Sequence, residues 1–345
     1  MTGKAPEILL SARNVCKDFA ISHSIVQRLR GQPPLSVHAL NGVSFDLFRG
    51  ETLGIVGESG CGKSTLARCL VRLHDCDAGQ ISYQGTDIAT LAGADRRAFN
   101  ARVQMIFQDP YSSLNPRMRV LQILAEALSV HKMRPAAAIP ARIAELLDLV
   151  RLPTDAAGKY PHEFSGGQRQ RIGIARALAV EPAVLVADEL VSALDVSIQA
   201  QVVNLLLQLQ EQLHLTVVFV AHDLRLVRHI SHRVAVMYLG RIVEIGPTEA
   251  LFSQPRHPYT KALLDAAPKM DPARRTRTVA APGELPSPVH LPNGCLFNSR
   301  CPHAFARCFT EPPILTDRGP DHLSACHLPG FGTDATPLPS IGAIA

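Results

Sequence analysis

The feature that most constrains the fold is the glycine-rich nonapeptide GESGCGKST at residues 57–65. It fits the phosphate-loop pattern G-x-x-x-x-G-K-[ST], with a buried-type strand expected before it at 51–56 and a helix after it at 63–73. Glycines let backbone N–H groups surround phosphates, and the helix directs its N-terminal dipole at the same anion. Lys63 supplies a positive charge to the β- and γ-phosphates, and Ser64 a hydroxyl ligand to Mg²⁺. The sequence therefore predicts an ATP and Mg²⁺ site, whose other loop residues are Gly57, Ser59, Gly60, Cys61, Gly62 and Thr65.

A second apolar segment, AVLVADE at residues 183–189, ends in two adjacent carboxylates. Asp188 is suited to hold Mg²⁺ through water. Glu189, one residue further along the strand, points elsewhere and can polarise the attacking water as a general base. Adjacent acids at a strand end are often only solvated turn residues, so this interpretation depends on the phosphate loop upstream.

Strands and helices alternate over most of the chain, which predicts an α/β fold with a mostly parallel, covered sheet. A helical pattern over 117–150 is interrupted at Pro135 and Pro140. Further strands are expected at 43–47, 216–221 and 233–238, and further helices at 168–180 and 198–213.

Composition narrows the class of protein. Hydrophobic residues make up 46% of the 345 positions, enough for a sizeable core. No apolar run approaches the roughly 18 residues that span a membrane, so we expect neither a transmembrane helix nor a signal peptide. The net charge of +5 is compatible with phosphates or an anionic membrane surface, and is too small to indicate nucleic acid.

Residues 164–171, FSGGQRQR, resemble the signature sequence of ATP-binding-cassette (ABC) proteins, which is usually written LSGGQ. A glycine pair that opens a helix forms an anion site. The resemblance implies a P-loop NTPase fold of the ABC nucleotide-binding type, with a mixed sheet core and a helical subdomain. It also implies that two such domains enclose ATP, so one chain alone is a poor enzyme. The residues that would contact the γ-phosphate held by the other subunit are Ser165, Gly166, Gly167 and Gln168.

Other elements follow in the order of this family. Gln108 resembles the Q-loop glutamine, which senses Mg²⁺ and links the site to the membrane partner, and residues 192–195 resemble the D-loop at the dimer interface. His222, 33 residues after Glu189, resembles the switch histidine that contacts the γ-phosphate. Phe19 resembles the aromatic residue that stacks on adenine.

The chain departs from the family pattern at Leu190, where proline usually follows the catalytic glutamate. Proline would fix the backbone φ directly after Glu189, and leucine leaves that turn freer. Both carboxylates are retained, so hydrolysis is still expected, with the rate more in question than the role.

Residues 107–118, 191–202 and 256–264 are similar to ATPases of oligopeptide and dipeptide importers, and more narrowly to their F-type subunit. The resemblance implies a D-type ATPase as the second subunit, two transmembrane permeases, and an extracytoplasmic substrate-binding protein that acts indirectly. It places the chain at the cytoplasmic face of the bacterial inner membrane. Nickel importers share much of this pattern, so an ATPase for nickel or another small solute is the alternative. A soluble ABC ATPase outside transport is a further alternative, although it would carry tandem cassettes or long insertions.

Composition changes near residue 269, where proline becomes dense and apolar periodicity stops. We therefore expect a nucleotide-binding domain at 1–268, with its helical subdomain at about 109–180, and a short Pro/Cys-rich extension at 269–345. The basic stretch 269–277 is expected to be a solvated linker.

Four cysteines crowd into this extension with the spacing C-x5-C-x6-C-x17-C. In a cytosolic protein such clustering indicates metal rather than disulfides, but the C-x2-C knuckles of zinc ribbons are absent. Four thiolates on loops can hold a 4Fe-4S cluster, as similar tails of dipeptide-importer ATPases do. Zinc, with His303 or His327 as fallback ligands, and unmetallated thiols stay open. Because the tail is short, a metal is expected to act as its missing core, held by Cys295, Cys301, Cys308 and Cys326.

Overall fold

The computed structural model describes residues 6–21, 35–109, 113–192, 194–266, 284 and 286–332. The basic segment at 269–277 lies outside these ranges. Within them, no helix combines the length and the apolar character needed to cross a membrane.

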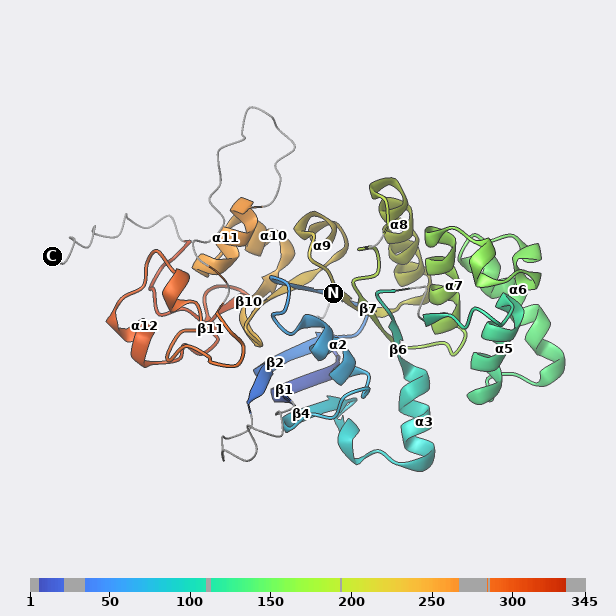
Figure 1. The fold of residues 1–345 in the computed structure, drawn as a ribbon, viewed down its shortest axis with the longest axis horizontal. Coiled ribbons are helices and arrows are strands. Elements are labelled where there is room, and N and C mark those ends of the chain that lie inside the picture. Colours follow the sequence, from blue (N-terminus) through green and yellow to red (C-terminus); the bar gives the residue numbers. More distant parts are fainter. Residues whose placement is uncertain are drawn as a thin grey trace, which may run out of the picture.

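An eight-stranded sheet forms the centre of the described chain, in the order β11-β12-β10-β9-β3-β8-β7-β6 (Figure 1). The strands from β9 to β6 run parallel, as predicted, whereas β10, β12 and β11 extend one edge antiparallel. Every residue of β3, β7 and β8 is buried, which explains their mainly apolar sequences. The strands are β3 (Thr52–Val56), β6 (Val103–Ile106), β7 (Val184–Asp188), β8 (Thr216–Val220), β9 (Arg233–Tyr238), β10 (Arg241–Pro247), β11 (Thr316–Asp317) and β12 (Leu323–Ser324).

A second sheet is antiparallel and has the order β2-β1-β4-β5. The sequence predicts strands before residue 56 but not this separate layer, because pairing between distant strands leaves no local pattern. Its apolar face packs with β3 and the helix after the phosphate loop in one buried cluster, which includes Leu9, Leu40, Leu53 and Leu66. The strands are β1 (Ile8–Ala20), β2 (Ser36–Phe48), β4 (Ala78–Tyr83) and β5 (Thr86–Asp87).

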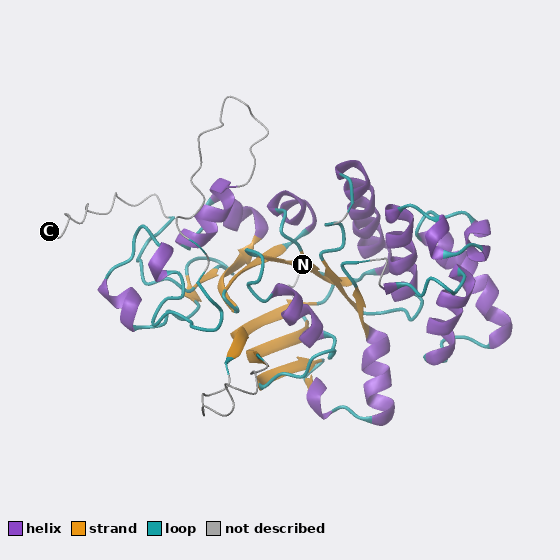
Figure 2. Ribbon diagram, viewed as in Figure 1, coloured by secondary structure: helices purple, strands orange, loops and turns teal. Residues whose placement is uncertain are grey.

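Helices α5, α6 and α7 form a group beside the β6 end of the large sheet (Figures 1 and 2). The helical pattern expected over 117–150 is resolved into α5 and α6, with Pro135 between them. Pro140 does not interrupt a helix; it lies in the first turn of α6, where its missing N–H needs no partner. The α-helices are α2 (Lys63–Leu70), α3 (Gly93–Arg102), α5 (Val120–Val130), α6 (Ile139–Leu149), α7 (Gly166–Leu178), α8 (Val196–Leu213), α9 (Leu224–Ile230), α10 (Thr248–Ser253), α11 (Pro258–Ala266) and α12 (Ala306–Thr310). The 3-10 helices are η1 (Ile88–Thr90), η2 (Ala136–Ala138), η3 (Thr154–Gly158), η4 (Pro161–Glu163) and η6 (Asn298–Arg300).

The described part of the tail, residues 286–332, packs against the large sheet. Its strand β12 pairs with β10. Phe297 is 1% exposed and belongs to the same buried cluster as the sheet and the helical group. Its ring centroid lies 5.4 Å from those of Tyr238 and Tyr259. The expectation that a metal replaces a missing core is therefore wrong for these residues, because the tail takes its core from the nucleotide domain.

Candidate nucleotide site

The phosphate loop begins where the buried strand β3 ends, and its last residues, Lys63 to Thr65, form the start of α2. Gly57 and Gly62 have φ of 155° and 100°, a region that other residues rarely adopt. A Cβ at Gly57 would meet the Met237 carbonyl oxygen, and one at Gly62 the Ala39 carbonyl oxygen. Both glycines are therefore required by the backbone conformation and by its close approach to neighbouring strands.

Lys63 is held inside the loop and is 4% exposed. Its Nζ donates to the carbonyl oxygens of Gly57, at 2.8 Å, and Glu58, at 3.0 Å. Cys61 is 1% exposed, and burial raises the pKa of its thiol. Ser59 and Gly60 are exposed, and Glu58, Ser64 and Thr65 are half-buried.

The Ser64 hydroxyl donates to Asp188 Oδ1 at 2.9 Å, so α2 and the end of β7 bring these two oxygen groups together. Asp188 is 2% exposed. Burial raises the pKa of its carboxyl and the nearby charge of Glu189 raises it further, while the hydrogen bond from Ser64 opposes them. Hydroxyl and carboxylate oxygens are the donors that Mg²⁺ prefers, so this pair fits the predicted metal.

Glu189 turns away from the line of β7. Its φ of 46° is uncommon for a residue other than glycine, and its backbone N–H donates to the Val220 carbonyl at 3.0 Å. The side chain accepts a hydrogen bond from Gln108 Nε2 at 2.5 Å. The two adjacent carboxylates therefore have different partners, Ser64 for Asp188 and Gln108 for Glu189.

His222 follows β8 and lines the same small cavity as Glu189. Because β6, β7 and β8 are parallel neighbours, their carboxyl ends meet at one edge of the sheet and bring Gln108, Glu189 and His222 together. Gln199 also lines this cavity and donates to the carbonyl oxygens of Val191, at 3.0 Å, and Leu194, at 2.9 Å. No motif in the sequence points to Gln199.

Leu190 is 1% exposed and belongs to the buried cluster of the large sheet and helical group. At this position, where the family usually has proline, the structure therefore has a core side chain. The unusual backbone angle lies at Glu189, one residue earlier.

The signature segment forms the N-terminal cap of α7. Gln168 N–H donates to Ser165 Oγ at 3.4 Å, and Ser165 N–H donates to Gln168 Oε1 at 3.0 Å, which completes a capping box. A Cβ at Gly166 would lie 3.1 Å from Leu194 Cδ2, and one at Gly167 would overlap Ile198 Cγ2. Figure 1 draws α7 within the helical group and α2 at the centre of the molecule, so one chain does not place these two helix starts side by side.

Phe19 lies on β1, with 37% of its surface exposed. Its ring meets the His74 ring edge-on, with centroids 5.4 Å apart, and Lys17 Nζ lies 5.7 Å from its centroid. The exposed part of the ring is available for a planar ligand.

The four tail cysteines are free thiols, and Cys301 lies near enough to the other three for their charges to affect its pKa. Burial, with a smaller contribution from the other tail thiols, raises the pKa of Cys295 to about 11 and that of Cys301 to about 12. Burial also raises the pKa of Cys326, as does the charge of Cys308. Within the described residues, no three His, Cys, Asp or Glu side chains are arranged to bind a single metal ion.

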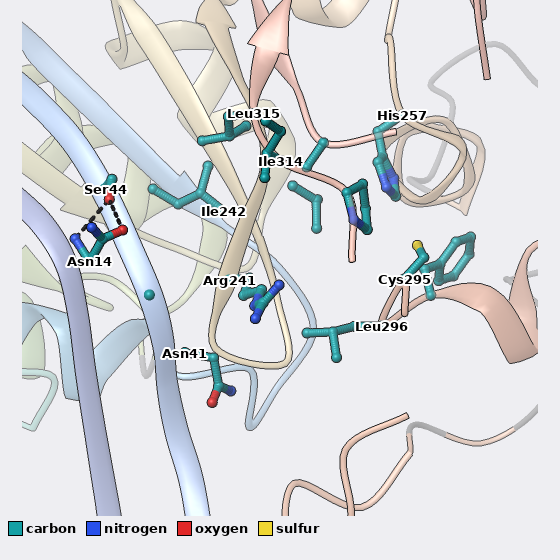
Figure 3. Close-up of a pocket in the computed structure, with 15 residues that line it drawn as sticks. Asn14, Asn41, Ser44, Arg241, Ile242, His257, Cys295, Leu296, Ile314 and Leu315 are labelled. Carbon is teal, nitrogen blue, oxygen red and sulfur yellow. Dashed lines mark hydrogen bonds between the residues drawn. The ribbon is translucent and has the colours of Figure 1, made fainter. Parts of the chain in front are cut away.

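A separate cavity of about 290 Å³ lies between β2, β10 and the tail (Figure 3). Arg241 and Cys295 are on its wall, together with apolar side chains such as Leu296 and Ile314. None of the side chains that the sequence predicts for the nucleotide site lines this cavity. Of the four tail cysteines, Cys295 lines it.

Two contacts to the phosphate loop come from residues that no sequence motif indicates. The Tyr259 hydroxyl accepts from the Glu58 N–H at 2.9 Å, across 201 positions of sequence. Arg300 pairs with the Glu58 carboxylate across 242 positions. Neither contact has a local signal, since each joins segments that meet only in the folded chain.

Comparison with known proteins agrees with this geometry. The model of the ABC transporter family matches residues 40–192, and that of the oligopeptide/dipeptide transporter C-terminal region matches residues 243–308. The chain is 49% identical to the oligopeptide transport ATP-binding protein AppF of Bacillus subtilis (strain 168), over 95% of this chain and 99% of that protein. It is 52% identical to YkfD of the same organism, also named as an oligopeptide transport ATP-binding protein, over 85% and 90% of the two chains.

Solved structures extend the likeness to the fold. The post-hydrolysis dimer of the ATP-binding cassette MJ0796 with ADP and Pi has a TM-score of 0.60 and 25% identity, covering 70% of this chain and 99% of that one. The ABC transporter subunit cbiO1 of Clostridium perfringens has a TM-score of 0.60 and 26% identity, covering 72% and 92%. The nucleotide site, the two family matches and the full-length relatives thus agree, and the chain belongs to the ATP-binding proteins of the oligopeptide/dipeptide ABC transporter family.

Proposed function

We propose that this chain is the ATP-hydrolysing subunit of an importer for di- or oligopeptides. Relatives named as oligopeptide transport ATP-binding proteins support this class of cargo. The observation that carries the proposal is a set of side chains with the required chemistry along the carboxyl ends of β3, β6, β7 and β8, namely Lys63, Ser64, Gln108, Asp188, Glu189 and His222.

The hydrolytic roles follow from these contacts. Lys63 would exchange its carbonyl partners for the β- and γ-phosphates, and Ser64 and Asp188 are the residues that would hold Mg²⁺, whose charge would offset that of the phosphates. Glu189 accepts a proton from the water that attacks the γ-phosphorus, and ADP leaves. Gln108 is hydrogen-bonded to that base, and in this proposal it reports the state of the base to the membrane subunits.

His222 and Phe19 are proposed to contact two other parts of the ATP molecule. His222 shares a cavity with Glu189 and contacts the γ-phosphate from the end of β8. Phe19 offers its exposed ring to adenine, since stacking on an aromatic face suits a planar base.

The signature segment serves a second subunit. Ser165, Gly166, Gly167 and Gln168 present the N-terminus of α7, an anion site by its dipole. Because α7 lies apart from α2 in one chain, this site completes the ATP pocket of a partner ATPase, which we take to be a D-type paralogue. Closure of the pair acts on two transmembrane permeases at the cytoplasmic face of the bacterial inner membrane, and an extracytoplasmic binding protein delivers the peptide.

Glu189→Gln tests the proposal in the assembled complex in proteoliposomes. We expect ATP to bind while ATP turnover falls by about 10²-fold or more, since the general base is lost, and peptide uptake to stop with it. Glu211→Gln, an exposed glutamate on α8, is the matched control and should retain parental rates. Parental turnover in Glu189→Gln would refute the base assignment. ATP-dependent uptake of another solute, with no uptake of any di- or oligopeptide, would refute the cargo.

We also propose that Cys295, Cys301, Cys308 and Cys326 hold a 4Fe-4S cluster, which would supply a bridge between tail segments. Each thiolate of such a cluster binds a different iron, so the four sulfur atoms spread further apart than around one ion. The electrostatic effect of Cys295, Cys308 and Cys326 on the Cys301 thiol supports the four thiols being near one another. Purification without oxygen should give a brown protein with about four irons per chain. A colourless, iron-free anaerobic protein would refute the cluster.

A further inference from the structure

Glu58, the second residue of the phosphate loop, is held by residues outside the loop. Its backbone N–H donates to the Tyr259 hydroxyl at 2.9 Å, and its carbonyl oxygen accepts from Lys63 Nζ at 3.0 Å. Arg300 donates twice to its carboxylate, Nη1 to Oε2 at 2.9 Å and Nη2 to Oε1 at 3.1 Å. A bidentate pair fixes the orientation of the carboxylate as well as its distance. The first turn of the loop therefore depends on a tail residue.

Arg300 is itself firmly placed. It is 7% exposed, and its guanidinium carbon lies 5.9 Å from the ring centroids of both Tyr238 and Phe297, within cation–π distance. Burial lowers the pKa of the guanidinium, but the hydrogen bonds to Glu58 and Tyr238 outweigh burial, and the pKa is raised. The side chain thus stays charged where it meets the loop.

The segment that carries Arg300 is joined to the tail cysteines. Cys301 is the next residue, and the carbonyl oxygen of Cys295 accepts from Asn298 N–H at 3.0 Å. Arg300 N–H donates to the Phe297 carbonyl at 3.1 Å, so η6 forms a short rigid unit between the two thiols.

We infer that Arg300 is a positioning residue for ATP binding: through Glu58 it holds the phosphate loop in the shape that receives the triphosphate, and it couples that loop to the cysteine-bearing tail. This inference rests on the proposed function of the loop. Arg300 contacts the loop rather than Gln108, Glu189 or His222, which follow other strands. Its contribution therefore falls on the affinity for ATP and not on the chemical step.

Arg300→Gln and Glu58→Gln, each in the assembled complex, test the inference by steady-state ATPase kinetics. One charge-assisted hydrogen-bonded pair is lost in either variant, so we expect the KM for ATP to rise about tenfold, with kcat within about twofold of the parent. The double variant should resemble the single ones, because all three remove the same pair. Arg300→Lys keeps the charge without the planar fork and should restore part of the affinity.

Arg307→Gln is the matched control, since Arg307 is an exposed tail arginine that also pairs with a glutamate, Glu311, at 2.7 Å. Its KM should equal that of the parent. An unchanged KM in both Arg300→Gln and Glu58→Gln would overturn the inference, as would a fall in kcat alone, which would indicate a general loss of folded protein. If Arg300→Gln does not fold, Glu58→Gln alone decides, because it removes the pair from the loop side. Failure of the proposed function is distinguishable, since the parental complex itself would then not hydrolyse ATP.

Discussion

Replacing Phe297 with alanine tests whether the tail shares its core with the nucleotide domain. The ring is 1% exposed, and its centroid lies 5.4 Å from Tyr238, 5.4 Å from Tyr259 and 6.0 Å from His257. Truncating a buried phenylalanine costs about 3–5 kcal/mol, because contacts are lost and a cavity remains. The surrounding rings are held by other elements and cannot collapse into the gap, so we expect a loss near the middle of that range, about 4 kcal/mol.

The measurement is urea unfolding of the purified chain, followed by circular dichroism because the chain has no tryptophan. Phe309→Ala is the control: this phenylalanine is in α12 of the same tail but is 51% exposed, so the change should stay within about 0.5 kcal/mol. Equal effects of the two substitutions, or a loss below about 1 kcal/mol for Phe297→Ala, would refute the shared core.

Three further predictions follow from buried groups. Burial lowers the pKa of His257 to about 3, so only the unfolded chain takes up a proton as the pH falls below its ordinary value of 6.5. The free energy of unfolding should therefore fall by about 1.4 kcal/mol per pH unit between pH 6.5 and pH 3. Urea titrations at several pH values measure this slope, and His257→Gln should flatten it. An unchanged slope in the variant would contradict the prediction. Burial raises the pKa of Asp188, so the negative charge of this carboxylate opposes folding at pH 7. Asp188→Asn should therefore stabilise the nucleotide-free chain at pH 7 by about 1 kcal/mol while abolishing Mg²⁺-dependent ATPase activity. A destabilised variant would show the reasoning to be wrong. Gly167→Ala forces a methyl group against Ile198, so thermal unfolding should show a loss of about 1–3 kcal/mol in stability. Gly158→Ala is the control and should be nearly neutral, because a Cβ there meets nothing within 4 Å. Equal effects would argue against close packing of α7 on α8.

The parts of the site that could be predicted from sequence are those whose chemistry lies in contiguous residues. The loop at 57–65 and the carboxylates at 188 and 189 each follow an apolar strand, and parallel strands bring such ends together. The central strands and the helices α2, α7 and α8 could be predicted for the same reason, because their periodicity is local.

What could not be predicted depends on contacts between distant segments. Arg300 and Glu58 are 242 positions apart, and nothing in the residues around either one indicates the other. The tail strands β11 and β12 are two residues each, too short for a pattern; β12 pairs with the edge of β10, and β11 pairs with β12. The missing-core expectation failed for a related reason: composition measures what a segment can bury by itself, and Phe297 is buried by side chains from elsewhere.

The pairing of β12 with β10 has a consequence for the chain while it is being synthesised. Ile242, Val243 and Ile245 make β10 an apolar strand, and Glu244 and Ile245 pair with Ser324 and Leu323. Until those residues have left the ribosome, the outer hydrogen-bonding groups of β10 have no strand beside them, which is the arrangement that recruits strands from other molecules. A chain terminated before residue 323 would keep this edge of β10 unpaired permanently, so premature termination should yield aggregates rather than a shorter functional subunit.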